Sequence, residues 1–195
     1  MATKKQSPAP AARPKKKLVM PASLAHIKPG ELPQSLLVAV KPYGQLHPLA
    51  AQAYTALREA AFSAGISTFK PTSAGDTYRS ISLQKQGFLA RYQLEPIPGA
   101  STRTWEGRTY YLKPNNAPMA APGSSRHNLA LAVDISQASG DRLAWMVENC
   151  DRFGFCWEVD SEPWHIFYYP GDKIPAAVEA WKQAKAAASP TLQQG

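Results

Sequence analysis

The chain has 195 residues, of which 44% are hydrophobic, and a formal net charge of +8. This length fits one ordinary domain with tails, and it excludes both a disulfide-stabilised miniprotein and a pair of full-sized enzyme domains. No stretch approaches the roughly 20 apolar residues that a helix needs to cross a bilayer, so the sequence excludes a membrane-spanning protein.

The positive charge is concentrated at the start of the chain. Residues 1–17 contain six of the 22 basic residues and none of the 14 acidic ones. Prolines and alanines in the same segment predict a basic arm that is disordered when alone. Two interpretations stay open: a solvated tail that aids solubility, or an arm that binds phosphates, an anionic wall polymer or an acidic partner in an assembly.

The arm lacks the apolar run and small-residue cleavage site of a secretory signal, so we expect no signal peptide. Proline-rich sequence continues after it, and regular patterns begin only near residue 47. We therefore expect a linker or docking segment at 18–46, a folded domain at 47–188 and a flexible tail at 189–195.

The first elements of the domain are predicted from apolar spacing and turn residues. Spacings of 4, 3 and 4 predict a helix from Pro48 to Gly65, and Ile66 to Lys70 is a short strand candidate. A turn then leads to a second helix at about 80–92. The loop at 93–126 is unusually long, and a small hairpin about Glu106 and Gly107 is expected within it at 102–112.

A strand at 129–136 is expected to have one bulky face and one face of small residues that ends in a carboxylate, which leaves volume for a ligand. Clustered strands and helices predict an α+β fold, with a small antiparallel sheet, flanking helices and a ligand cleft over the sheet. The other expected elements are a helix from Ser139 or Asp141 to about Phe153 that ends at Gly154, antiparallel strands at 155–159 and 164–169, and a helix at 174–187.

Two histidines stand close to carboxylates in the sequence. His127 precedes Asp134 by seven residues, and Glu162 precedes His165 by three. Two imidazoles and one carboxylate suit a catalytic zinc ion, because three protein ligands leave a fourth position for water. A carboxylate nearby but off the metal can take a proton from that water, and Glu162 is the candidate. Cys150 and Cys156 are too widely spaced for a zinc site of paired cysteines; we interpret them as structural, and a disulfide stays open.

Three motifs resemble one enzyme family. The sequence from Ser125 to Asp134 resembles the SxHxxGxAxD motif of the LAS family of zinc peptidases, which act on peptidoglycan, and residues 162–165 resemble its ExxH motif, commonly EPWH. Tyr78-Arg79-Ser80 with Gln84 is similar to the YRS-x3-Q segment of its carboxypeptidase members. Order and spacing agree over approximately residues 48–170.

The resemblance implies a zinc-dependent D,D-carboxypeptidase-like enzyme that hydrolyses the peptidoglycan stem peptide, with 47–188 as the peptidase domain. One Zn²⁺ would be bound by His127, Asp134 and His165, Glu162 would be the general base, and Arg79 would hold the substrate carboxylate or the developing oxyanion. Ser80 and Gln84 would contact the peptide, or be a helix cap and an exposed polar residue.

Two positions depart from the family pattern. Ala130 replaces the motif glycine, and Thr77 replaces the glycine that usually precedes the tyrosine. A strand conformation accepts alanine, so we expect activity to be intact, whereas a positive φ at this position would strain it.

Three alternatives to the carboxypeptidase stay open: an L-alanyl-D-glutamate endopeptidase, a non-catalytic wall-binding or virion structural protein on the same fold, and a nucleic-acid binder that depends only on the arm. Because no signal peptide is expected, the enzyme would reach the wall after release by lysis or on a bacteriophage particle. The basic arm would then dock to that assembly.

Overall fold

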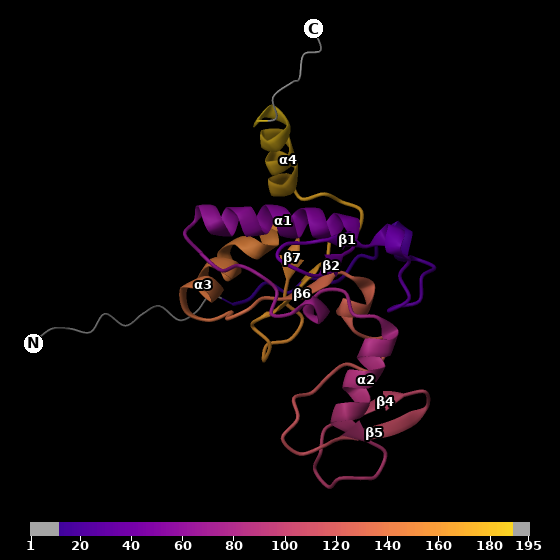
Figure 1. Ribbon diagram of the computed structural model, residues 1–195. Coiled ribbons are helices and arrows are strands. Elements are labelled where there is room, and N and C mark those ends of the chain that lie inside the picture. The colour runs from indigo at the N-terminus through magenta and orange to yellow at the C-terminus, as the bar shows by residue number, and fades with distance from the viewer. Residues whose placement is uncertain (1–11, 189–195) are drawn as a thin grey trace, which may run out of the picture.

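The computed structural model describes residues 12–188, so the predicted tail and most of the predicted arm lie outside the described residues. Helix α1 (Pro48–Ser63) lies across the body, α4 (Ala176–Ala188) projects on one side of it, and α2 (Ile81–Arg91) carries a small lobe on the other side (Figure 1). Helix α3 (Gly140–Asn149) continues into the 3-10 helix η5 (Cys150–Phe153). None of the helices among residues 12–188 is long and apolar enough to span a bilayer.

The strands form three small antiparallel sheets. In the central one, β8 (His165–Tyr168) lies between β6 (Ala132–Asp134) and β7 (Phe155–Cys156). The second pairs β5 (Arg108–Leu112) with β4 (Thr102–Trp105) and β3 (Tyr92–Gln93), and the third pairs β1 (Val38–Ala39) with β2 (Gln45–Leu46). The predicted α+β class with an antiparallel sheet is confirmed.

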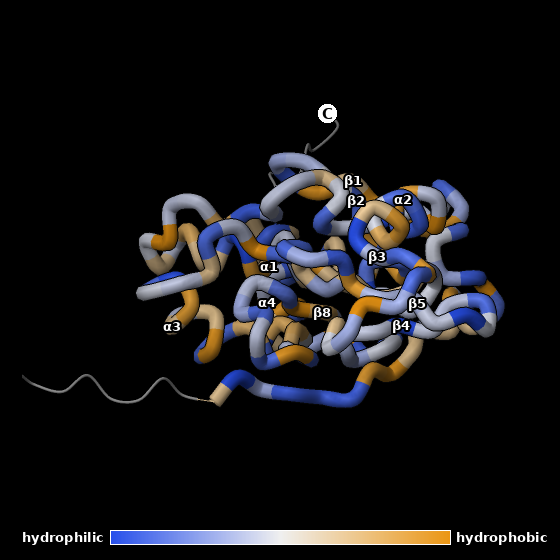
Figure 2. Tube along the Cα trace, turned by 90° about the horizontal axis from the view of Figure 1, so that it is seen from below, coloured by the Kyte–Doolittle hydropathy of each residue, from blue (hydrophilic) through white to orange (hydrophobic). Residues whose placement is uncertain are grey.

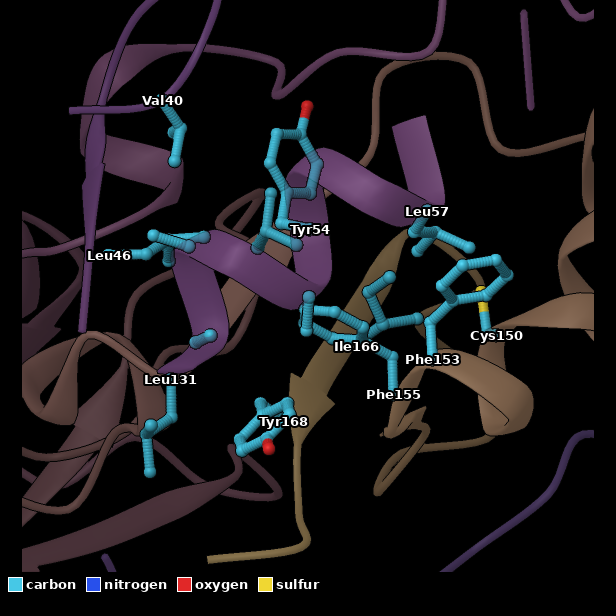
Figure 3. Packing of buried hydrophobic residues seen from close by; sticks show 14 of the residues in the cluster. Val40, Leu46, Tyr54, Leu57, Leu131, Cys150, Phe153, Phe155, Ile166 and Tyr168 are labelled. Carbon is cyan, nitrogen blue, oxygen red and sulfur yellow. The ribbon is translucent and has the colours of Figure 1, made fainter. Parts of the chain in front are cut away.

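The main core fills the space between α1, η5 and the central sheet. Figure 3 shows Tyr54 and Leu57 of α1 gathered with Phe153, Phe155 and Ile166. A second cluster, with Phe88 of α2 and Tyr110 of β5 among its members, holds the small lobe together. Burial of these side chains is the main stabilising contribution, at about 25 cal/mol per Å² of apolar surface.

Most predicted elements are confirmed with small changes in their bounds. Helix α1 begins with Pro48 at its first turn, and Gly65 follows its end with a φ of +83°. The hairpin at 102–112 turns at Glu106 and Gly107, both with positive φ, as a tight hairpin turn requires. The other confirmed elements are α2, α3 with η5 ending at Gly154, the antiparallel pair β7–β8, and α4.

The strand predicted at Ile66–Lys70 is wrong. The Ile66 N–H bonds back to the carbonyl of Ala61, which closes the end of α1. Beyond it, the Lys70 carbonyl accepts a hydrogen bond from the Ser136 N–H, and Pro71 forms an isolated bridge with Ile135. Proline has no N–H to continue a ladder, so no strand develops there.

The segments before the domain pack against it. Residues of 18–46 such as Leu24, Leu32 and Val40 are buried in the main core. Nearer the start of the chain, the Pro14 carbonyl accepts a hydrogen bond from the backbone N–H of Trp157 at 3.0 Å. Figure 2 shows this hydrophilic beginning of the described chain running along the body before a hydrophobic stretch. The disorder expected for the arm therefore does not extend to residues 13–17.

Candidate metal centre and catalytic cleft

Two imidazoles and one carboxylate converge at one end of the central sheet. His127, Asp134 and His165 each offer one ligand atom, and these atoms all lie within 4.8 Å of one another. Asp134 and His165 are register partners in the β6–β8 ladder, so strand pairing places them side by side. His127 comes from the 3-10 helix η4 (Arg126–Leu129), whose N-terminus is capped by Ser125. The structure thus brings the three predicted ligands together.

The two imidazoles face opposite oxygens of the same carboxylate. Nε2 of His127 lies 3.3 Å from Oδ2 of Asp134, and Nδ1 of His165 lies 2.8 Å from Oδ1. Nδ1 of His127 donates to the backbone carbonyl of Thr77 at 2.8 Å, which directs Nε2 toward the centre of the cluster. The arrangement presents two nitrogens and one carboxylate to a common point, and zinc prefers such donors.

The electrostatics of the cluster also suit a cation. Burial opposes ionisation of Asp134, yet hydrogen bonds from His127 and His165 outweigh it and hold the pKa of this carboxyl far below its usual range. Burial disfavours the charged form of His165, but its bonds to Asp134 and Glu158 raise its pKa to about 9. A buried carboxylate that attracts positive charge this strongly fits a divalent ion, so the donor set and its charge both accommodate zinc.

The backbone at Ala130 corrects the expectation for this motif. Residues 129–131 are not part of the strand: η4 ends at Leu129, Ala130 has φ +55° and ψ +27°, and β6 begins at Ala132. An L-residue in this left-handed conformation costs roughly 1–2 kcal/mol relative to the right-handed one. Backbone hydrogen bonds hold it there, since the Ala130 N–H donates to His127 and its carbonyl accepts from His47.

The small-residue face of the strand is also not the empty volume that was expected. Ala132 is fully buried in a cluster with Cys156 and Phe167, and Leu18 packs against that cluster. Only Asp134, at the end of β6, lines the cleft. The cluster of candidate metal ligands therefore lies at the end of the central sheet.

Arg79 lines the same cleft and is held from three sides. Its Nε donates to the Gly75 carbonyl at 3.0 Å, Nη1 to Oε1 of Gln84 at 3.1 Å, and Nη2 lies 3.3 Å from Oδ1 of Asp76. The Arg79 backbone N–H also donates to the carbonyl of His127, which connects the segment that carries the guanidinium to the segment that carries the first candidate metal ligand. A guanidinium fixed in this way is suited to a carboxylate or a developing oxyanion.

The two other predicted substrate residues behave differently. Gln84 is fully buried and lines the cleft. It links Arg79 to the loop at Ala120, because its Oε1 accepts from Arg79 and its Nε2 donates to the Ala120 carbonyl at 2.7 Å. It is therefore not an exposed polar residue. Ser80 accepts a hydrogen bond from the Leu83 N–H as the N-cap of α2 and is not among the residues that line this cavity. The geometry favours the helix-cap interpretation of Ser80.

Glu162 lies at the rim of the cleft in the turn before β8. The cavity, of about 880 Å³, is bounded by Glu162, Trp164, Arg79 and the three cluster residues among others. The backbone N–H of His165 donates to the carbonyl of Glu162, which closes a turn that contains Pro163. Among the described residues, the Glu162 side chain has no hydrogen-bond partner, which leaves its carboxylate available to a substrate or water.

Sequence reasoning missed Asp76, Glu158 and a role for the Thr77 backbone. Asp76 pairs with Arg79, and Oε1 of Glu158 lies 3.4 Å from Nε2 of His165. The position of Asp76, three residues before Arg79, could have signalled its pairing. Thr77 acts through its carbonyl and Glu158 through a loop contact, and the sequence carries no signal for either. Both cysteines are free and buried, so the structure contains no disulfide among residues 12–188.

Known proteins resemble this chain over the same region. The family model for VanY, D-alanyl-D-alanine carboxypeptidase, matches residues 44–171. A D-alanyl-D-alanine carboxypeptidase of Enterococcus faecalis (strain ATCC 700802 / V583) is 38% identical over 80 residues, which cover 33% of this chain and 29% of that relative. The match thus spans less than a third of the curated relative.

Solved structures with a similar arrangement were also found. VanYB in complex with D-alanine-D-alanine is 22% identical, with a TM-score of 0.46 over 76% of this chain and 83% of that one. DacB from Streptococcus pneumoniae D39 is 22% identical, with a TM-score of 0.43 over 78% and 82% of the two chains.

Proposed function

Because the chain belongs to the VanY family of D-alanyl-D-alanine carboxypeptidases, we propose that it is a zinc-dependent peptidase that removes the terminal D-alanine from peptidoglycan stem peptides. The observation that carries this proposal is the buried cluster of His127, Asp134 and His165 in a cleft that Glu162 and Arg79 also line. A solved relative, a mutant of the vancomycin resistance D,D-pentapeptidase VanY, is a complex with Zn(II).

The roles of the side chains follow from their positions. Zinc bound by the three cluster residues would lower the pKa of water to about 7 and polarise the scissile carbonyl. Glu162 takes a proton from the attacking water and passes it to the leaving amine, since its carboxylate is unpartnered and lines the cleft. Arg79 binds the terminal carboxylate or the oxyanion, and Gln84 holds Arg79 in place.

The test is mass spectrometry of muropeptides that end in D-alanyl-D-alanine, incubated with the zinc-loaded protein. The wild type should release one terminal D-alanine. Glu162→Gln should bind zinc but release none, whereas Glu148→Gln, an exposed glutamate on α3, is the matched control and should remain active. A cut between L-alanine and D-glutamate would replace the carboxypeptidase proposal by an endopeptidase, and zinc binding without any cleavage would favour a non-catalytic wall-binding protein.

Delivery to the wall by lysis or on a phage particle, with the basic arm as the docking element, stays a prediction. The experiment that bears on it is protease treatment of intact particles: an arm protected only in the particle would support docking. An arm cleaved equally in particles and in the purified protein would contradict it.

A further inference from the structure

Each imidazole of the cluster has an outer partner on the side away from Asp134. For His127 the partner is the Thr77 carbonyl, at 2.8 Å from Nδ1. For His165 it is the carboxylate of Glu158, whose Oε1 lies 3.4 Å from Nε2 while Nδ1 faces Asp134. Histidines that bind a metal usually donate their second N–H to a carbonyl or carboxylate, which fixes both the tautomer and the ring orientation.

Glu158 is itself held in position. Its other oxygen, Oε2, lies 3.0 Å from Nε of Arg126. The guanidinium of Arg126 stands over the ring of Phe167, 5.5 Å from its centroid, which is within cation–π range. Arg126 directly precedes His127, and Phe167 lies two residues after His165 in β8. The Arg126–Glu158 pair therefore connects the two segments that carry the histidines.

Glu158 and Glu162 line the same cleft but differ in their surroundings. Both oxygens of Glu158 are engaged, one by His165 and one by Arg126. The Glu162 carboxylate has no partner among the described residues. A group that must accept and release a proton needs a free oxygen, whereas a group that orients a ligand needs fixed contacts.

We propose that Glu158 is a positioning residue for the metal site: it accepts the Nε2–H of His165, so that the ring presents Nδ1 to the ion, and Arg126 holds Glu158 in place. The proposal rests on the proposed metal site. It assigns Glu158 no contact with the substrate and no part in proton transfer.

The test is the zinc dissociation constant of the whole protein, measured by competition with a chromophoric chelator. Glu158→Ala should bind zinc about 10–100-fold more weakly, the usual effect of removing such an outer partner. Glu158→Gln, which retains a carbonyl oxygen that can accept the Nε2–H, should recover part of that loss. Asp160→Asn removes the same charge from the same loop without touching His165, and its dissociation constant should stay within about twofold of wild type.

A second measurement separates positioning from a general structural effect. Nitrogen-15 NMR of the imidazoles reports which His165 nitrogen carries the proton in the zinc-loaded protein. Wild type should show Nε2–H, and Glu158→Ala should show exchange or loss of that state while the metal-free protein still unfolds in one cooperative transition. Zinc affinity equal to wild type with the same tautomer would overturn the inference. Failure of the wild type itself to bind zinc would instead overturn the proposed function.

Discussion

Replacing Gly44 by alanine should damage the protein through Thr77, the residue that stands where relatives of the LAS type have glycine. Gly44 has a φ of +101°, and a Cβ added there would lie 2.3 Å from Oγ1 and 2.8 Å from Cγ2 of Thr77. Thr77 cannot move freely, because Oγ1 accepts from the Gln45 N–H at 3.0 Å and donates to the Ala74 carbonyl at 2.7 Å.

Two contributions set the magnitude. An L-residue with positive φ costs roughly 1–2 kcal/mol, and overpacking a buried site costs roughly 1–3 kcal/mol. Gly44→Ala should therefore lower the free energy of unfolding by about 2–5 kcal/mol, which in a protein of this size is about 4–20 °C in unfolding temperature. Because the Thr77 carbonyl orients His127, zinc affinity should fall as well.

The assay is urea and thermal unfolding of Gly44→Ala, Thr77→Gly and the double variant. Thr77→Gly removes the atoms that the new methyl group would meet, so the double variant should be more stable than the sum of the single effects by about 1–3 kcal/mol. A Gly44→Ala protein within about 0.5 kcal/mol of wild type, or strictly additive effects, would refute the reasoning.

Three further predictions concern the cleft, the N-terminal segment and the cysteines. Arg79→Lys cannot reproduce the three fixed contacts of the guanidinium, so kcat/KM should fall about 100- to 1000-fold with zinc affinity unchanged; a loss below tenfold would contradict this role. Deleting residues 1–17 removes the Pro14 carbonyl and leaves the buried backbone N–H of Trp157 without its acceptor, which should lower the free energy of unfolding by about 1–3 kcal/mol. An unchanged free energy of unfolding in urea would contradict this prediction. Burial raises the pKa of Cys156 to about 12 and that of Cys150 well above its usual value, so almost no thiolate forms at pH 8 and iodoacetamide should label both only after unfolding; rapid labelling of the native protein would contradict this.

The sequence alone predicted the elements whose cause is local. Proline at the start of α1, glycine after its end, and the Glu106–Gly107 turn act over a few residues, so these elements could be assigned without tertiary information. The three candidate metal ligands could also be named from the sequence, because the motifs that contain them resemble those of a family of zinc peptidases. Strand pairing between Asp134 and His165 then completes the site.

Features that depend on distant contacts could not be predicted. Ala130 has a positive φ at the end of η4, where its carbonyl accepts a hydrogen bond from the His47 N–H. The composition of Ile66–Lys70 favours a strand, but its first residue instead closes the end of α1 through the Ala61 carbonyl. The contact of Glu158 with His165 depends on how the loop after β7 folds back over the cleft. In each case a neighbour far away in the sequence, or the path of a loop, overrides the local preference.

Crystals of the zinc-loaded protein, measured on both sides of the zinc absorption edge, test the central claim most directly. One anomalous peak should lie about 2.0–2.1 Å from Nε2 of His127 and Nδ1 of His165, with an oxygen of Asp134 about 2.0–2.2 Å away. Absence of a peak at saturating zinc, or a peak bound by other side chains, would contradict the metal centre on which the proposed activity depends.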